Sequence, residues 1–482
     1  MGGELKEKVA QGVAWSMAEK IGSMLLAMAV RLVILRLLTR DILGFMSIPS
    51  AVVTVLLVIV DSGFSQSLIR HKGPSQSDYK SVFLFNIAVS VALYALLVAV
   101  APLAARWYEM PEIAQIAPVF FLLLPLSALS AVQNTIFIRQ FRFALLSKVT
   151  FASSLVGGLT AIALALAGWG IWSLVAERVI AIGMRTALLW WLSDWRPCGK
   201  CGLKPLREMA PFGCSLMVTD LISNFYNKIP QFFLGKLYSP ATLGSFDQAV
   251  KLKDMPATTG IQAVQNVTFP ALAKIRDDAP KFAEGYRQVV MVVAYVMFPI
   301  MLGMSAVAHD MFAVLLGEEW MPTVPYFEAV CLAGLFSPIA LTAYNVLKAR
   351  CEGPLIVRLE VVKKVIMTAI FAVTIPHSVM AVVWGLVAIS FCEMAVNFVA
   401  TTRFTTLTIW RFLRTLLPVA LVSGAMYAVV RFTAAALPDD TLLRLMAELG
   451  AGLVSYLVLS ALFRLEAFRE VMAIIKKQVA RK

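Results

Sequence analysis

The sequence predicts an all-α polytopic membrane protein with about fourteen transmembrane helices, arranged as two pseudo-symmetric six-helix lobes plus two C-terminal helices. Three observations predict this class. Hydrophobic residues make up 60% of the 482 residues and charged residues only 15%, whereas soluble domains carry about 25% charged residues. Apolar segments long enough to cross a bilayer recur along the whole chain. Lysine and arginine gather in alternate connections between them.

The apolar segments are separated by short polar connections, none of them long enough for an independently folded domain. Each segment contains at least roughly the 20 residues that span the hydrocarbon core of a bilayer. In chain order, spans are expected near residues 12–38, 43–66, 79–105, 113–138, 146–168, 169–194, 208–237, 240–272, 285–314, 323–349, 354–376, 379–404, 411–436 and 441–463. An even number of spans places both ends of the chain on the same side of the membrane.

Basic residues gather in every second connection, and this pattern sets the predicted orientation. The rich set holds Arg70, Lys72, Lys80, Arg139, Arg142, Lys148, Arg196, Lys200, Lys204, Arg207, Lys274, Arg276, Lys281, Arg287, Lys348, Arg350, Arg358, Arg403, Arg411, Arg414 and the tail through Lys482. The other set holds only Arg36, Arg40, Arg106, Lys236, Arg431 and Arg444. The positive-inside rule therefore predicts that both termini are cytoplasmic. It also explains the formal net charge of +14 without a nucleic-acid partner.

The spans divide the chain into five expected parts. These are an N-terminal lobe at 1–194, a basic cytoplasmic linker at 195–207, a C-terminal lobe at 208–404, two additional helices within 411–463 and a basic cytoplasmic tail at 464–482. The middle parts of the additional helices are nearly free of charge, with Glu448 as the exception, and we expect these helices to pack outside the twelve-helix core.

An internal repeat supports the division into two lobes. Residues 37–44 (LLTRDILG) correspond to residues 237–244 (LYSPATLG) at an offset of 200, and three of the eight positions are identical. Six spans separate the two copies, so both copies have the same orientation in the membrane. Two parallel lobes of this kind are a transporter architecture.

The first span carries a polar stripe with two cations. Its members recur at spacings of 4, 4, 3, 4 and 4, which is helical periodicity, and are Gly12, Ser16, Lys20, Ser23, Ala27 and Arg31. A charge inside a span costs roughly 3 kcal/mol and nearly always faces a bundle interior or a watery cavity. An alternative is that Lys20 pairs with Glu19 while Arg31 extends to the membrane surface. We interpret Lys20 and Arg31 as one wall of a cationic cavity that Ser16 and Ser23 also line.

The second lobe repeats this pattern with amides and carboxylates. The seventh span carries Asp220, Asn224, Asn227 and Gln231, and the eighth carries Asp247, Lys251, Asp254, Thr258, Gln262 and Gln265, all at helical spacing. Lys251 is a third candidate for anion binding, but a ladder neutralised within the helix explains it equally well, because Lys251 lies one turn from both aspartates. Asn224, Asn227, Gln231 and Gln262 are candidates for the polar lining of the cavity.

Two carboxylates in the second lobe are candidates for ion coupling. Asp220 lies one helical turn from Asn224, and Glu393 of the twelfth span lies one turn from Asn397. A carboxylate with an amide neighbour can bind a proton or Na⁺, so we expect Asp220, or Glu393 with Asn397, to couple transport to an ion gradient. The alternative, that these acids neutralise nearby cations such as Lys228, is equally compatible with the pattern.

The motifs of an enzyme or a metal site are missing. The sequence contains no G-x-x-x-x-G-K-[ST] phosphate-binding loop, and its histidines (His71, His309 and His377) all fall near loops. Cys198 and Cys201 form a lone C-x-x-C without further ligands nearby. We therefore expect a transporter rather than an enzyme, without a cofactor and without a bound metal.

Short motifs occur in a characteristic order along the chain. They are DSGFSQSLIR at 61–70, DY at 78–79 with SVF at 81–83, WRP at 195–197, FG at 212–213, VTFP at 267–270 and LGEEW at 316–320. In order and spacing they resemble the polysaccharide transport family of flippases, the Wzx-type proteins of the multidrug/oligosaccharidyl-lipid/polysaccharide exporter superfamily. The resemblance covers about residues 5–405. Similar proteins tend to carry an arginine shortly after Leu243-Gly244, where this chain has Gln248, with Lys251 and Lys253 as the nearby cations.

The resemblance implies a multi-pass flippase of the bacterial inner membrane. Its expected cargo is an undecaprenyl-pyrophosphate-linked oligosaccharide repeat unit, moved from the cytoplasmic to the periplasmic leaflet by alternating access for lipopolysaccharide, exopolysaccharide or capsule biosynthesis. The expected partners are this lipid-linked oligosaccharide, membrane lipid and other polysaccharide-assembly proteins. A proton or sodium gradient is the expected means of coupling.

Two other functions stay open at this point. An ion-coupled multidrug exporter of the same superfamily would favour an acidic or aromatic cavity. The carboxylates of Asp220, Asp247 and Glu393 are compatible with such an exporter, whereas the Lys20 and Arg31 stripe argues against it. A membrane polysaccharide polymerase would need a sizeable periplasmic loop with catalytic groups, and the outer connections here are short.

Overall fold

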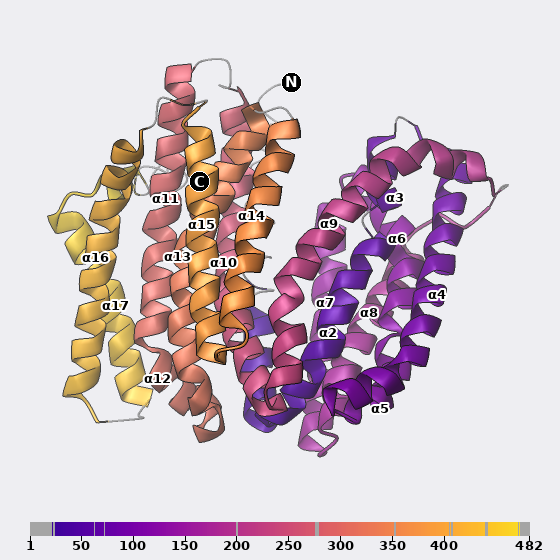
Figure 1. Ribbon diagram of the computed structural model, residues 1–482, viewed down its shortest axis with the longest axis horizontal. Coiled ribbons are helices and arrows are strands. Elements are labelled where there is room, and N and C mark those ends of the chain that lie inside the picture. Colours follow the sequence, from indigo (N-terminus) through magenta and orange to yellow (C-terminus); the bar gives the residue numbers. More distant parts are fainter. Residues whose placement is uncertain are drawn as a thin grey trace. The chain divides into compact units, whose positions relative to one another are not determined.

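The computed structural model describes residues 22, 25–61, 63–71, 73–198, 201–274, 279–350, 353–403, 405, 408–438, 442–470 and 472, the side chains of 61, 203, 258–279, 349–350 and 353–354 excepted. Within these residues every regular element is a helix, and no strand occurs. The chain forms two compact units, residues 1–244 and 245–482. Figure 1 shows both as bundles of long helices.

Unit 1 contains eight labelled helices and a helix at residues 25–37 (indigo to magenta in Figure 1). The labelled helices are α2 (Arg40–Asp61), α3 (Gly63–Arg70), α4 (Gln76–Tyr108), α5 (Glu112–Phe120), α6 (Leu123–Arg139), α7 (Phe143–Leu166), α8 (Ile171–Leu192) and α9 (Leu203–Leu237). Helix α7 packs against α8, and α9 packs against α2, α3 and α4. The first residues of α10 (Pro240–Lys274) also belong to this unit.

Unit 2 contains the rest of α10 and the helices that follow it (pink to yellow in Figure 1). They are α11 (Ala279–Ala306), α12 (Ala308–Met311), the π-helix η1 (Phe312–Leu316), the 3₁₀-helix η2 (Glu318–Thr323), α13 (Val324–Arg350), α14 (Gly353–Thr374), α15 (Val379–Thr401), α16 (Ile409–Ala436) and α17 (Leu442–Leu462). Helix α13 packs against α11 and α15, and the α16–α17 pair packs against α11.

The protein is a multi-pass membrane protein. Nine stretches of the described chain are long and apolar enough to cross a membrane. Four further long helices, α8, α9, α10 and α14, carry charged residues, and each coincides with a segment that the sequence marks as a span. Large apolar side chains face outward, for example Leu421 of α16 and Leu453 of α17, each 64% exposed. Such outward leucines are explained by a lipid surround, because hydrocarbon solvates them as well as a protein core does.

The two copies of the internal repeat meet inside unit 1. The first turn of α2 crosses the first turn of α10 so closely that a β-carbon on Gly44 would overlap the backbone of Pro240. In the same way, a β-carbon on Gly244 would overlap the backbone carbonyl of Arg40. Positions 40 and 44 therefore contact positions 240 and 244 reciprocally, as two surfaces related by a two-fold axis do.

Several of the short motifs hold the helices of unit 1 together. Gly63 at the start of α3 lies against Gly213 of α9, where an added β-carbon on Gly213 would stand 2.8 Å from the Gly63 carbonyl oxygen. Beside this contact, Ser67 Oγ donates a hydrogen bond to the Met209 carbonyl over 3.2 Å. Arg139 of α6 donates hydrogen bonds to the carbonyl oxygens of Leu68, Ile69 (3.2 Å) and His71 (2.8 Å). These bonds provide partners for carbonyl groups at the C-terminal end of α3, where the helix itself offers none. This motif region serves helix packing.

An aromatic cluster attaches the segment after α8 to α4. The Phe83 ring lies 5.6 Å from that of Trp195 and 5.8 Å from that of Trp190, both in edge-to-face geometry. Trp195 Nε1 donates to Gln76 Oε1 over 2.7 Å, and the Gly202 backbone N–H donates to Ser81 Oγ over 3.1 Å. The motifs at 78–83 and 195–197 thus form one packing site.

Candidate functional site

Of the stripe predicted on the first span, the structure describes Ala27, which is exposed, and Arg31. The side chain of Arg31 is half-buried in the helix at residues 25–37. Ser16, Lys20 and Ser23 lie outside the described residues. The pairing of Lys20 with Arg31 on one wall therefore stays a prediction.

The polar residues of α9 divide between exposed and buried positions. Asp220 and Asn227 are exposed, Asn224 is half-buried, and Gln231 is only 3% exposed. Asn224 Nδ2 donates to the backbone carbonyl of Asp220 over 2.8 Å. The amide is therefore bonded to the main chain of its own helix, and Gln231 is the most enclosed of the predicted lining residues on this helix.

On α10, the lysines form ion pairs within their own helix. Lys251 Nζ lies 2.5 Å from Asp247 Oδ2, and Lys253 Nζ lies 2.5 Å from Asp254 Oδ1. Asp247 is almost wholly buried, whereas about a third of the Lys251 side chain is exposed. The contact between Lys251 and Asp247 is one that we expect if the aspartates of α10 neutralise Lys251 within the helix. Part of the Lys251 side chain nevertheless stays accessible. Gln248, at the place of the family's arginine, is fully buried. Gln262 lies on α10, but its side chain is outside the described part.

Glu393 belongs to a charged cluster formed by α13, α14 and α15. Glu393 is half-buried, and the groups that act on it electrostatically are Lys363, Lys364 and Glu360. Lys363 Nζ lies 2.5 Å from Glu360 Oε1 and is 8% exposed as a side chain. The Tyr344 ring of α13 lies beneath two ammonium groups, Lys348 at 4.4 Å and Lys363 at 4.8 Å from its centre.

Of this cluster, the sequence pattern predicted Glu393 as a functional residue but not Lys363 or Tyr344. The spacing of Glu360 and Lys363 by three residues is a local signal that predicts their contact. The position of the Tyr344 ring has no such signal, because it comes from another helix.

Asn397 connects α15 to α13. Its Nδ2 atom donates to the Ala340 carbonyl over 3.0 Å, and the side chain is 3% exposed. The amide is therefore engaged with the backbone of the neighbouring helix. Ser390 and Ser337 add a second polar contact between the same two helices, with 3.3 Å between their hydroxyl oxygens.

A second buried charged cluster lies where α17 meets α12. Arg444 Nε lies 2.7 Å from Asp310 Oδ2 and 3.5 Å from Glu448 Oε1, and both carboxylates are about 1% exposed as residues. His309 Nδ1 lies 3.2 Å from Asp310 Oδ1. Of this cluster, only Glu448 was expected from the sequence to be a charge inside a span. The spacing of four residues to Arg444 predicts that pair, whereas Asp310 is remote in the chain.

Comparison with known proteins shows which family and which solved structures this chain is similar to. The sequence profile of the family described as "Polysaccharide biosynthesis protein" matches residues 33–325. The succinoglycan biosynthesis transport protein ExoT of Rhizobium meliloti (strain 1021) is 24% identical over 331 residues, which covers 68% of this chain and 67% of that protein. Among solved structures, the lipid II flippase MurJ in an inward closed conformation superposes with a TM-score of 0.78 at 12% identity, covering 94% of this chain and 99% of that one.

A second solved structure has the same fold at greater distance. An inward-facing multidrug resistance MATE transporter of the MOP superfamily superposes with a TM-score of 0.60 at 13% identity, covering 84% of this chain and 98% of that chain. The profile match extends over more than half of this chain, and the all-helical membrane fold agrees with it. The chain belongs to the polysaccharide biosynthesis protein family.

Proposed function

We propose that this protein is a flippase that moves a lipid-linked oligosaccharide, joined through pyrophosphate to undecaprenol, from the cytoplasmic to the periplasmic leaflet of a bacterial inner membrane. Family membership carries the proposal, together with lysines placed inside helices of a membrane protein. Charges in a span are costly and mark substrate or ion pathways. A pyrophosphate is an anion that lysine and arginine recognise, and amide and hydroxyl groups suit sugars.

In this proposal, two lobes with cytoplasmic termini alternate between inward-open and outward-open states. Lys20 and Arg31 hold the pyrophosphate, and Lys251 assists from the second lobe. Because Lys251 is paired with Asp247, an incoming pyrophosphate would take over part of that ion pair. The partly exposed ammonium group can then serve the anion without ever becoming an unpaired charge.

Cation binding lowers the barrier to crossing and need not drive export. The free energy of an anion that leaves an inside-negative compartment falls by about 2.3 kcal/mol per charge per 100 mV. Binding that is too tight would slow release on the far side.

The test is flipping of a defined lipid-linked oligosaccharide by purified protein in vesicles. We expect Lys20→Ala/Arg31→Ala to reduce flipping by at least tenfold while the protein still inserts, because the pyrophosphate loses both of its cationic partners. Lys20→Arg should be milder than Lys20→Ala. Lys72→Ala, which removes a cation from a predicted cytoplasmic connection, is the control at matched protein density. Near-normal flipping by the double variant would contradict the cationic wall.

The alternative is an ion-coupled multidrug exporter. The half-buried carboxylate of Glu393 and the buried carboxylate of Asp247 favour it, since such residues suit a cationic cargo. The same vesicles distinguish the two proposals. An exporter of cationic drugs would transport a lipophilic dye under an ion gradient and leave the lipid-linked oligosaccharide in its original leaflet.

A further inference from the structure

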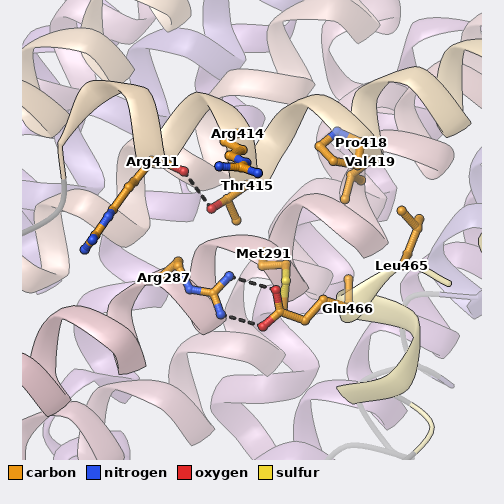
Figure 2. A pocket seen from close by; sticks show the side chains of 10 residues that line it. Arg287, Met291, Arg411, Arg414, Thr415, Pro418, Val419, Leu465 and Glu466 are labelled. Carbon is orange, nitrogen blue, oxygen red and sulfur yellow. Dashed lines mark hydrogen bonds and ion pairs between the residues drawn. The ribbon is translucent and has the colours of Figure 1, made fainter. Parts of the chain in front are cut away.

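A cavity of about 300 Å³ lies between α11, α16 and the segment that follows α17 (Figure 2). Five of its residues come from one face of α16 at helical spacing. The lining consists of Arg287, Met291, Arg411, Arg414, Thr415, Pro418, Val419, Leu465, Glu466 and Ala467. By the charge pattern of the sequence, this end of α11 and α16 is the predicted cytoplasmic end.

One of the three arginines is already neutralised. Arg287 donates to both carboxylate oxygens of Glu466 over 2.5 and 2.9 Å, and to Glu284 over 3.0 Å (the Glu466 contacts are dashed in Figure 2). These bonds tie the segment after α17 to α11 and close one side of the cavity. Arg287 therefore has little donor capacity left for a ligand.

The other two arginines carry charge that the described part of the chain does not compensate. Arg411 and Arg414 are exposed, and no described side chain forms an ion pair or a hydrogen bond with either guanidinium group. Both lie in the first two turns of α16, a helix end that is itself positive, and no acidic residue occupies the first turn. An anion bound here would therefore stabilise this helix end.

An apolar row on the outer side of α16 begins beside Arg414. Trp410 is 74% exposed beside Arg411, where an aromatic ring suits the boundary between water and lipid. Leu413, Leu417 and Leu421 are 50%, 58% and 64% exposed and follow one another at one helical turn each. Leu417 and Leu421 follow Arg414 by three and seven residues, so this outward-facing row lies beside Arg414, whereas Arg411 lies farther around the helix.

We propose that this cavity binds the phosphate-bearing headgroup of an anionic phospholipid in the cytoplasmic leaflet. The guanidinium groups of Arg411 and Arg414 hold the phosphate, and the acyl chains lie along the row of Leu413, Leu417 and Leu421. A free phosphate or pyrophosphate would use only the arginines, so the row of leucines favours a lipid. The bound lipid links α16 to the segment after α17 through the same cavity. The proposal does not depend on which molecule the protein transports.

The experiment compares lipids by their effect on thermal unfolding of the purified protein in phosphatidylcholine nanodiscs. We expect phosphatidylglycerol to raise the unfolding temperature, because a ligand that binds only the native state stabilises it. In Arg411→Gln/Arg414→Gln, the apparent affinity for phosphatidylglycerol should fall at least tenfold. Lys204→Gln/Arg207→Gln removes two exposed cations from the predicted cytoplasmic end of α9 and should keep the response of the unaltered protein.

Three outcomes would overturn the proposal. The first is an equal response to phosphatidylglycerol in the arginine variant and in the unaltered protein. The second is an equal loss in the control variant, which would show attraction to charge in general. The third is an equal stabilisation by soluble glycerol phosphate or pyrophosphate, which would show a site for free anions. If Arg411→Gln/Arg414→Gln does not fold, Leu417→Gln/Leu421→Gln replaces it, and unchanged retention of phosphatidylglycerol by native mass spectrometry would contradict the lipid site.

Discussion

At the residue scale, the glycines of the internal repeat are packing residues. Gly244 touches the backbone of Arg40, and its counterpart Gly44 touches that of Pro240. Neither neighbour can move aside as a flexible side chain would, because both contacts are with backbone atoms. Steric exclusion of a side chain therefore explains why both copies of the repeat carry glycine at this position.

We expect Gly244→Ala to destabilise the protein by about 1–3 kcal/mol, the usual cost of forcing a methyl group into a packed contact. Gly183→Ala is the matched control, because a β-carbon on Gly183 of α8 would meet nothing within 4 Å. That change should be neutral or slightly stabilising, as alanine favours a helix over glycine. Thermal unfolding of the purified proteins measures both. Equal unfolding temperatures for the two variants would contradict the close crossing.

At the element scale, buried charge ties the C-terminal helix α17 to α12. Arg444 contacts both Asp310 and Glu448, so its removal leaves two buried carboxylates without their shared cation. A buried ion pair that loses one partner costs about 3–5 kcal/mol.

We therefore expect Arg444→Met to destabilise the protein by about 3–5 kcal/mol. Adding Glu448→Gln should recover part of the loss, because one uncompensated charge disappears. Arg431→Met, at an exposed cation of α16, should stay within about 0.5 kcal/mol of the unaltered protein. Chemical unfolding of the three variants gives the comparison, and a full-size effect in Arg431→Met would show that net charge rather than the buried contact is responsible.

The contact between α11 and the segment after α17 predicts a pH dependence. Hydrogen bonds from Arg287 hold the pKa of the Glu466 carboxyl below its ordinary value of 4.5. Because the folded-state pKa is the lower one, the contact contributes its full stability above pH 4.5 and loses it as the pH falls through the lowered pKa. We expect this acid-side loss to be smaller in Glu466→Gln. Unfolding temperatures between pH 7 and pH 3 test this, and identical pH profiles would contradict it.

At the scale of the whole molecule, the positions of most spans follow from hydrophobic length. The segment expected at 411–436 is α16 at Ile409–Ala436, and the one expected at 379–404 is α15 at Val379–Thr401. A long apolar run has only one low-energy structure in a bilayer, which is why the helices are predictable. Contacts within one helix are predictable in the same way, as the Asp247–Lys251 pair illustrates.

Contacts between remote segments leave no local pattern. Asp310 and Arg444 lie on different helices, and nothing in the periodicity of either helix indicates the other. The Ala340 carbonyl that Asn397 binds is a backbone group, which no sequence motif reveals. The candidate site was therefore predictable as a set of polar stripes, but not as a set of partners.

The last prediction concerns ion coupling of transport. Asp220 is exposed and Glu393 is half-buried among Lys363, Lys364 and Glu360, so the two carboxylates occupy different surroundings. We propose that one of them carries the coupling, and Glu393 is the stronger candidate, because binding or losing a proton there changes the balance of a partly buried charged cluster. Glu393→Gln should then abolish the dependence of flipping on a proton or sodium gradient and leave slow, gradient-independent flipping. Asp220→Asn should retain the gradient dependence. The measurement is leaflet exposure of a lipid-linked oligosaccharide in vesicles with and without each gradient. If both variants kept full gradient dependence, the coupling role of these acids would be excluded, and their function would be to neutralise the neighbouring lysines.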